Sequence, residues 1–139
     1  MSETRALHWA DAVAQDVLQH QSRHLLSTGI TPSGEYHVGH LREILTAEGV
    51  YRALCDQGAE VRMHYIADTM DPLRRVYAFL DPTVYQNAVG KPLCDIPCPC
   101  GAHPSYAEHY LEPFLEAVHK LGVEMDVLRA DELYRQGQL

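Results

Sequence analysis

The chain has 139 residues, of which 46% are hydrophobic and 22% charged, and its formal net charge is −8. This size and composition are those of an ordinary globular protein with one core, so we expect a single domain over residues 1–139. The net charge and the scattered positions of the 11 Lys and Arg residues argue against a broad nucleic-acid-binding surface. No apolar run approaches the roughly 18 residues of a membrane helix. The N-terminal residues also lack a signal peptide's apolar segment, so we expect a cytoplasmic protein with reduced cysteines and no membrane contact.

The first half of the chain predicts two parallel strands joined by a helix. The expected elements are an amphipathic helix over 9–20, a strand over 24–28, a helix over 38–56 and a strand over 60–67. Gly58 is a natural C-terminal cap of the second helix. Gly49 inside that helix costs about 1 kcal/mol relative to Ala, which indicates close packing there. Cys55 lies on the apolar side of the helix pattern and is expected in the core.

The second half predicts a long loop, a helix, a strand and the start of a last helix. Residues 69–104 contain six prolines, a density too high for regular elements. Ser105 predicts the N-cap of a helix reaching Leu121, which Pro113 should kink or restart. A third strand is expected over 123–128 and a last helix from 131. This order indicates an open parallel α/β sheet, in which ligands bind beyond the carboxyl ends of the strands.

The most informative stretch is residues 28–43, Thr-Gly-Ile-Thr-Pro-Ser-Gly-Glu-Tyr-His-Val-Gly-His-Leu-Arg-Glu. A strand, a loop of small residues and a helix start together form a place to hold phosphates, because backbone N–H groups and the helix dipole favour an anion there. His37 and His40 are three residues apart, so they project to one side of the first turn and can donate to phosphate oxygens. The alternative is a pair of surface histidines beside an ordinary turn.

This stretch resembles the His-Ile-Gly-His signature of class I aminoacyl-tRNA synthetases and their nucleotidyltransferase relatives. More narrowly, it is similar to class I (archaeal-type) lysyl-tRNA synthetase, in which Thr-Gly-x-x-Pro-Ser-Gly leads into the signature. Three further segments, 8–11, 68–76 and 105–110, resemble segments of that family. The resemblance covers about residues 9–133 and implies the first half of a Rossmann-type catalytic domain.

The resemblance implies an enzyme that forms lysyl-adenylate from L-lysine and ATP, with Mg²⁺, and transfers lysine to tRNA(Lys). The residues that it assigns to ATP are Pro32, Ser33, Gly34, His37, Gly39 and His40. The two histidines would stabilise negative charge on the phosphate during catalysis. Gly39 would let the adenine and ribose approach the backbone.

The amino acid would be held by Gly29 and Thr31 and by a carboxylate that meets an ammonium group. Asp68 is the best candidate for this carboxylate, with Asp71 behind it, and the weaker candidates are Glu35 and Glu43. The alternative for the two aspartates is an Asx turn or an N-cap before Pro72. The family's Asp-Asp pair is Asp68-Thr69 here, so one carboxylate of the family pattern is absent.

A second group of candidate residues is Cys98, Cys100, His103 and His109. Two thiolates and two imidazoles within twelve residues suit tetrahedral Zn²⁺, and four protein ligands would make the metal structural. The resemblance also implies zinc in this segment, and we expect a zinc-binding insertion over residues 92–110. Asp95 and Cys94 are spare ligands. The alternative is a cysteine pair in a Pro-rich loop beside surface histidines.

The Lys-Met-Ser-Lys-Ser motif of class I synthetases has no counterpart here, because the only lysines are Lys91 and Lys120. We therefore expect an N-terminal catalytic fragment of a lysine–tRNA ligase, incomplete for aminoacylation alone and with little tRNA surface. One alternative is a small adenylyltransferase of the same superfamily. Another is a non-catalytic, zinc-stabilised binding module derived from a synthetase. The sequence leaves the oligomeric state open.

Overall fold

The computed structural model describes residues 7–138. Its elements are α1 (Trp9–Leu18), β1 (Arg23–Ile30), α2 (Val38–Asp56), β2 (Glu60–Ala67), α3 (Pro82–Tyr85), the 3-10 turns η1 (Gln86–Ala88) and η2 (Leu93–Asp95), α4 (Tyr106–Lys120), β3 (Asp126–Arg129) and α5 (Ala130–Arg135). The predicted bounds of α2 and β2 are confirmed. The extreme N-terminus, to which the signal-peptide prediction refers, lies outside the described residues.

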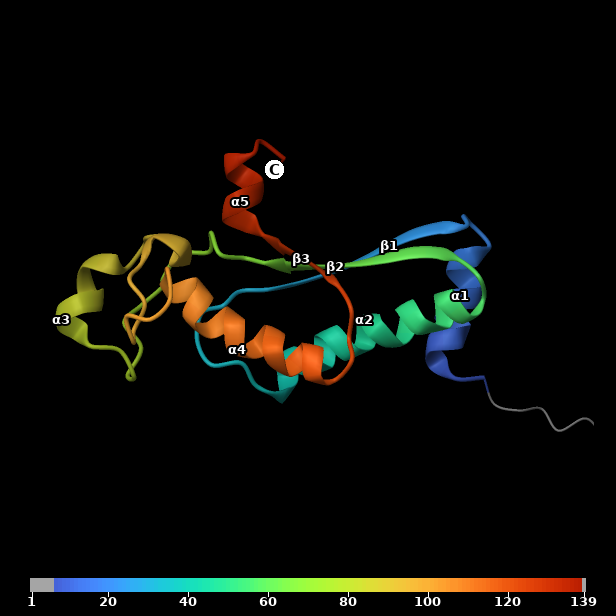
Figure 1. The fold of residues 1–139 in the computed structure, drawn as a ribbon, viewed down its shortest axis with the longest axis horizontal. Helices are drawn as coiled ribbons and strands as arrows, with labels where there is room; N and C mark the ends of the chain where they lie inside the picture. Colours follow the sequence, from blue (N-terminus) through green and yellow to red (C-terminus); the bar gives the residue numbers. More distant parts are fainter. Residues whose placement is uncertain (1–6, 139) are drawn as a thin grey trace, which may run out of the picture.

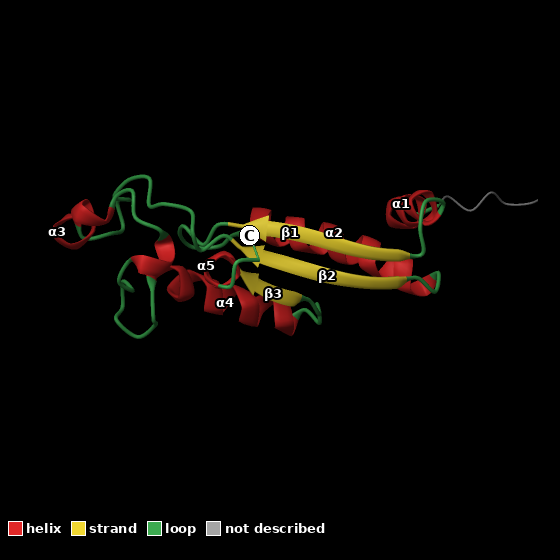
Figure 2. Cartoon of the chain, turned by 90° about the horizontal axis from the view of Figure 1, so that it is seen from above, coloured by secondary structure: helices red, strands yellow, loops and turns green. Residues whose placement is uncertain are grey.

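The three strands form one open parallel sheet in the order β1-β2-β3, as predicted. Helices α2 and α4 lie together on one face of the sheet, and α1 lies at the end where the strands begin (Figures 1 and 2). Helix α5 leaves the end of β3 toward the other face. The carboxyl ends of all three strands therefore point toward the start of α2, the start of α5 and the long segment between β2 and α4.

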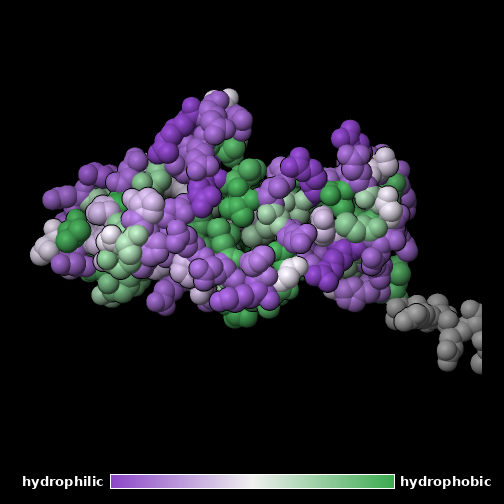
Figure 3. Space-filling view, in the orientation of Figure 1, coloured by the Kyte–Doolittle hydropathy of each residue, from purple (hydrophilic) through white to green (hydrophobic). Residues whose placement is uncertain are grey.

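The main core lies between the sheet and its two covering helices. Tyr65 of β2, Ile44 of α2 and Leu111 of α4 are fully buried in it. The opposite face of the sheet carries fewer covering elements, and Leu25 of β1 is 59% exposed there. Hydrophobic side chains are visible along the sheet beside α5 (Figure 3). Among the described residues, no helix is both long and apolar enough to cross a membrane.

The segment from 69 to 104 is more ordered than the sequence predicts. It contains α3 and two 3-10 turns, and it builds its own buried cluster, in which Leu73, Leu93 and Ile96 pack against Tyr106. Pro82 occupies the start of α3 after an Asp81 N-cap, a position where the fixed proline φ favours the helix. The proline density therefore marks tight turns around a small core, and the prediction of a wholly irregular loop is wrong.

Other local predictions have mixed outcomes. Gly49 packs closely, since a Cβ there would lie 3.3 Å from the Trp9 ring, and Gly58 has the positive φ of a C-terminal cap. Cys55 is exposed, so the prediction of a core cysteine is wrong: the buried face of α2 ends at Leu54. Helix α4 runs through Pro113 without a break, because its buried apolar stripe holds both halves against the sheet.

The third strand begins at Asp126, three residues later than predicted. Val123 is buried in the main core, but its N–H bonds the Val118 carbonyl at the end of α4. Gly122 precedes it with a φ of 76°. Val123 therefore belongs to the turn that closes α4. The prediction began the strand too early because an apolar residue that is buried in a turn has the same sequence signal as a buried strand residue.

Candidate functional site

The two signature histidines form the N-terminal cap of α2. The Gly39 N–H donates to His37 Nδ1 at 3.1 Å, and the His37 N–H donates to His40 Nδ1 at 3.0 Å. The two ring centroids are 3.9 Å apart. Because each Nδ1 atom accepts a hydrogen bond, the proton of each neutral imidazole resides on Nε2. Both rings can therefore donate an Nε2–H to an anion.

This geometry changes the source of the anion contacts. The sequence suggested backbone N–H groups at the helix start, but those of His37 and Gly39 already donate to imidazoles. Burial, together with the neighbouring His37, lowers the pKa of His40. His40 is therefore neutral at pH 7 and acts there as a hydrogen-bond donor.

Gly39 is required by the free chain itself. A Cβ at this position would lie 2.8 Å from His37 Cε1 and 2.9 Å from its Nδ1. Any side chain would therefore push the His37 ring out of its capping position. Glycine at this position therefore makes room for the His37 ring in the free chain. The resemblance implies a second role, which is to let the nucleotide approach the backbone.

A hollow of about 430 Å³ lies at the carboxyl ends of β1 and β2. It brings together the predicted residues Gly29, Thr31 and Asp68, and α5 adds Ala130 and Tyr134 to its wall. A Cβ on Gly29 would lie 3.5 Å from the Ile66 carbonyl oxygen, an ordinary van der Waals contact, so the fold alone does not require glycine there. Sequence reasoning missed the α5 residues, although the topology would have found them, because α5 follows a third parallel strand at the same sheet edge.

The remaining predicted residues do not join this hollow. His37 lines a separate hollow of about 620 Å³, between the start of α2 and α4. Asp71 pairs with Arg74 at 3.3 Å. Glu43 accepts a hydrogen bond from the Gly29 N–H at 3.2 Å, on the edge of β1 away from β2. In the part of the chain that the structure describes, Gly29, Thr31 and Asp68 therefore line one hollow and His37 lines another, while His40, Glu43 and Asp71 line neither.

The segment 105–110 ties these parts together. The Tyr106 hydroxyl donates to the Ser33 carbonyl at 2.7 Å, which fixes the loop before α2. Both Glu108 carboxylate oxygens accept from Arg129, at 2.6 and 2.9 Å, which fixes the end of β3. Ser105 caps α4 through the Glu108 N–H, as predicted. Sequence similarity singled out this segment, but only the structure shows these contacts.

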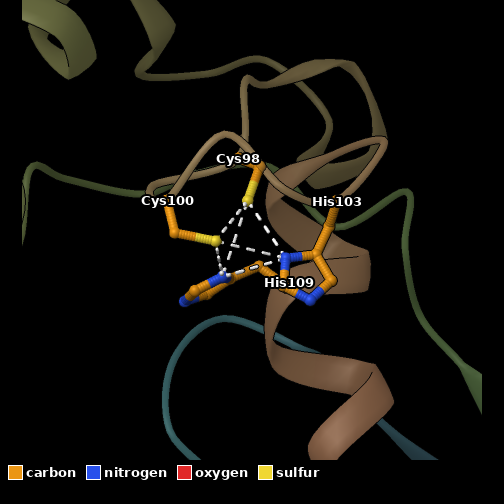
Figure 4. A group of neighbouring side chains, drawn as sticks. All are labelled: Cys98, Cys100, His103 and His109. Carbon is orange, nitrogen blue, oxygen red and sulfur yellow. Dashed lines mark hydrogen bonds between the residues drawn. The ribbon is translucent and has the colours of Figure 1, made fainter.

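The predicted zinc ligands lie together (Figure 4). The Sγ atoms of Cys98 and Cys100 and the Nδ1 atoms of His103 and His109 are separated pairwise by 3.3 to 3.5 Å. Four points with equal spacing form a tetrahedron, whose centre lies roughly 0.61 of an edge, here about 2.1 Å, from each corner, close to Zn–N and Zn–S bond lengths. The donor set and its geometry therefore fit Zn²⁺.

The electrostatics of the cluster also suit a cation. Burial raises the pKa of the Cys98 thiol, but hydrogen bonds from His103 and Cys100 outweigh this effect and lower the pKa to about 5. A thiolate is the form that binds metal. By contrast, Cys94 contacts Met70 and Asp95, and burial raises its pKa to about 11. Cys94 and Asp95 lie outside the four-residue cluster.

Comparison with known proteins identifies the family of the chain. The family profile described as "tRNA synthetases class I (K)" matches residues 7–139. The chain belongs to this family. It is 56% identical to Lysine--tRNA ligase 1 of Methanosarcina acetivorans over 131 residues, which are 94% of the chain and 24% of the relative. It is 52% identical to the Lysine--tRNA ligase of Archaeoglobus fulgidus (94% and 26%) and 42% identical to that of Pyrococcus horikoshii (95% and 26%). The chain thus spans about a quarter of the length of these relatives.

The departure from the family pattern at Thr69 has a structural explanation. Thr69 is 1% exposed, its hydroxyl donates to Asp131 Oδ1 at 2.5 Å, and it accepts from the Asp131 N–H at 3.0 Å. Its side chain therefore faces the start of α5 and does not line the hollow of about 430 Å³ that Asp68 lines. A carboxylate at position 69 would meet that of Asp131, so threonine suits this packing.

Proposed function

We propose that the chain is the N-terminal part of the catalytic domain of a lysine–tRNA ligase. The complete enzyme forms lysyl-adenylate from L-lysine and ATP and transfers the lysyl group to tRNA(Lys). The observation that carries the proposal is the pair of Nε2 donors of His37 and His40, held at the carboxyl edge of the sheet in a member of this family.

The reaction needs positioning and charge stabilisation more than covalent help. The lysine carboxylate attacks the α-phosphorus of ATP, a phosphorus–oxygen bond forms, and pyrophosphate leaves with the electrons of the broken bond. Negative charge grows on the α-phosphate oxygens in the transition state. His37 and His40 donate their Nε2–H groups to these oxygens, so no proton transfer is required of them.

The other predicted residues have the following roles in the proposal. Pro32, Ser33, Gly34 and Gly39 shape the ATP loop, and Mg²⁺ enters with the nucleotide. Gly29 and Thr31 hold the amino acid, and Asp68 meets an ammonium group. Asp71 is a weaker candidate, because its carboxylate pairs with Arg74.

We also propose that residues 92–110 form a zinc-binding insertion in a partial Rossmann-type domain. Cys98, Cys100, His103 and His109 would hold the ion, and the metal would stabilise the Pro-rich loop without an open coordination position. With a net charge of −8, this chain would contribute little to tRNA binding.

The proposal is tested by calorimetric titration of the zinc-loaded chain with a sulfamoyl analogue of lysyl-adenylate, with alanyl and glutamyl analogues as controls. The expected result is selective binding of the lysyl compound. His37→Asn keeps a side chain that can cap α2 but removes the Nε2 donor, so binding should weaken at least tenfold without loss of fold. His119→Asn is the matched control, because it makes the same substitution at an exposed position in the last turn of α4.

Two outcomes would contradict the proposal. Equal affinity for all aminoacyl analogues would favour the adenylyltransferase alternative, with a different acceptor. No binding of any adenylate by the folded, zinc-loaded chain would favour a non-catalytic module, and the catalytic role of the two histidines would then be withdrawn.

A further inference from the structure

Tyr36 is a half-buried aromatic residue that the proposed reaction leaves without a role. It lies one residue before the His37 cap of α2, and two other elements hold its side chain. Its hydroxyl shares a hydrogen bond of 3.0 Å with the hydroxyl of Tyr65 in β2. Its ring stacks on the ring of Phe114 in α4, with centroids 4.0 Å apart and planes 14° from parallel. The Tyr36 ring is therefore fixed relative to both the sheet and α4.

The hydroxyl pair is a strong restraint on this ring. Tyr65 is 0% exposed, and among the described residues the Tyr36 hydroxyl is the one hydrogen-bond partner of its side chain. Moving Tyr36 would leave a buried hydroxyl unpaired, which is unfavourable. Burial raises the pKa of Tyr36 to about 12, so its hydroxyl stays protonated at neutral pH. Tyr36 therefore serves as a contact and not as a base.

The edge of this fixed ring pair meets the second signature histidine. The centroids of the Tyr36 and His40 rings are 5.0 Å apart, and their planes are inclined by 61°. The other restraints on the His40 ring come from His37, through its N–H and its exposed ring. A histidine ring turns about a broad torsion, so one hydrogen bond to Nδ1 leaves the direction of Nε2 loosely defined. The contact with Tyr36 ties that ring to the sheet and to α4.

We propose that Tyr36 is a positioning residue for His40. Held by Phe114 and by the Tyr65 hydroxyl, its ring keeps the His40 imidazole in the orientation in which Nδ1 accepts from the helix cap and Nε2 donates to the phosphate. This inference rests on the proposed function and adds a residue that acts through His40 without touching the substrate.

The test begins with nitrogen NMR of the histidine side chains in the free, zinc-loaded chain at pH 8, with the His40 signals assigned from His40→Gln. The unmodified chain should show His40 with its proton on Nε2. In Tyr36→Leu, the Nδ1 and Nε2 signals of His40 should move toward the averaged values of an imidazole that exchanges its proton between both nitrogens. Tyr36→Phe should lower the urea midpoint, because the Tyr65 hydroxyl loses its partner, yet it should keep the His40 signals, because it keeps the ring.

The matched control is Tyr51→Leu, the same substitution at a half-buried tyrosine that packs against the main core from α2, three turns beyond His40. It should leave the His40 signals unchanged. In calorimetry with the lysyl-adenylate analogue, Tyr36→Leu should weaken binding roughly 3- to 30-fold, because misplaced groups lose much of their effect, and Tyr36→Phe should stay within about 3-fold of the unmodified chain.

The outcomes separate this inference from the proposed function. Unchanged His40 signals in Tyr36→Leu would overturn the positioning role, whatever the change in affinity. Equal shifts in Tyr36→Leu and Tyr51→Leu would overturn it too, because the effect would then belong to the core as a whole. If the unmodified chain binds no adenylate analogue, the proposed function fails, while the NMR measurement on the free chain still decides whether Tyr36 orients His40.

Discussion

Replacing Thr69 with valine tests whether the contact between the β2 loop and α5 is a real determinant of stability. The substitution keeps the branched shape of the side chain and removes only its hydroxyl. That hydroxyl makes two hydrogen bonds with Asp131, at 2.5 and 3.0 Å, and both residues are buried, at 1% and 8% exposure. Thr69→Val therefore deprives one carboxylate oxygen of a donor and one backbone N–H of its acceptor.

The expected cost follows from these contacts. A hydrogen bond to a charged group contributes about 1.5–3 kcal/mol, and a buried N–H left unpaired costs about 1 kcal/mol or more. Asp131 keeps its contact with Arg135 and some access to water, so we expect a total loss near 3 kcal/mol. This is a large part of the roughly 5–15 kcal/mol of a typical domain and corresponds to a fall in Tm of about 10 °C.

The measurement is urea unfolding of the zinc-loaded chain, followed by circular dichroism and by the fluorescence of Trp9, the single tryptophan. Thr83→Val is the matched control, because the Thr83 hydroxyl makes a similar 2.7 Å bond to Asp81 at an exposed site. Its cost should be below about 0.5 kcal/mol. Equal costs for the two variants would refute the argument from burial. Equal costs of Thr69→Val with and without Asp131→Asn would show that the two residues are not coupled.

Three further changes test the metal cluster and the start of α2. Cys100→Ser should lower zinc affinity on the order of 100-fold or more in a chelator competition, and an unchanged affinity would exclude Cys100 as a ligand. Glu112→Gln should lower zinc affinity about 3- to 10-fold, because the Glu112 Oε2 atom lies 3.4 Å from His103 Nε2 and would orient that ring; Glu116→Gln, on the next turn, should not. Gly39→Ala should weaken binding of the lysyl-adenylate analogue at least tenfold through displacement of His37. Its free energy of unfolding should change by no more than about 1 kcal/mol, since the lost cap and the gained helix propensity oppose each other.

Most of the fold could be predicted from the sequence, because its signals are local. Periodic apolar residues and a glycine cap determine α2, and β-branched and aromatic residues determine β2. Predictions were wrong where a residue's environment depends on distant contacts. Val123 is buried like a strand residue but belongs to a turn, and Cys55 lies just outside the buried face of α2. Pro113 does not interrupt α4, because packing on the sheet outweighs one lost backbone hydrogen bond.

The candidate site was predictable in its residue types but not in its geometry. Spacing alone grouped the four cluster residues, since they fall within one loop and the following helix turn. No local signal could show that position 69 faces α5 or that Tyr134 reaches the hollow of Asp68. Both depend on contacts between segments brought together by the parallel sheet. The Nδ1 contacts of the two signature histidines are local, since they form the cap of one helix, but the spacing of the histidines did not specify them.

The start of α4 explains how a metal without an open coordination position can still influence the candidate substrate site. Within four residues, Tyr106 holds the loop before α2, Glu108 holds the residue before α5, and His109 belongs to the metal cluster. These side chains share one turn of helix, so they move as a unit. An ion bound by His109 and by the preceding loop would fix that turn, and with it both the histidine-bearing loop and the wall that carries Tyr134. We therefore expect an ion in the cluster to support the proposed substrate site, so that loss of zinc disturbs ligand binding before it unfolds the sheet.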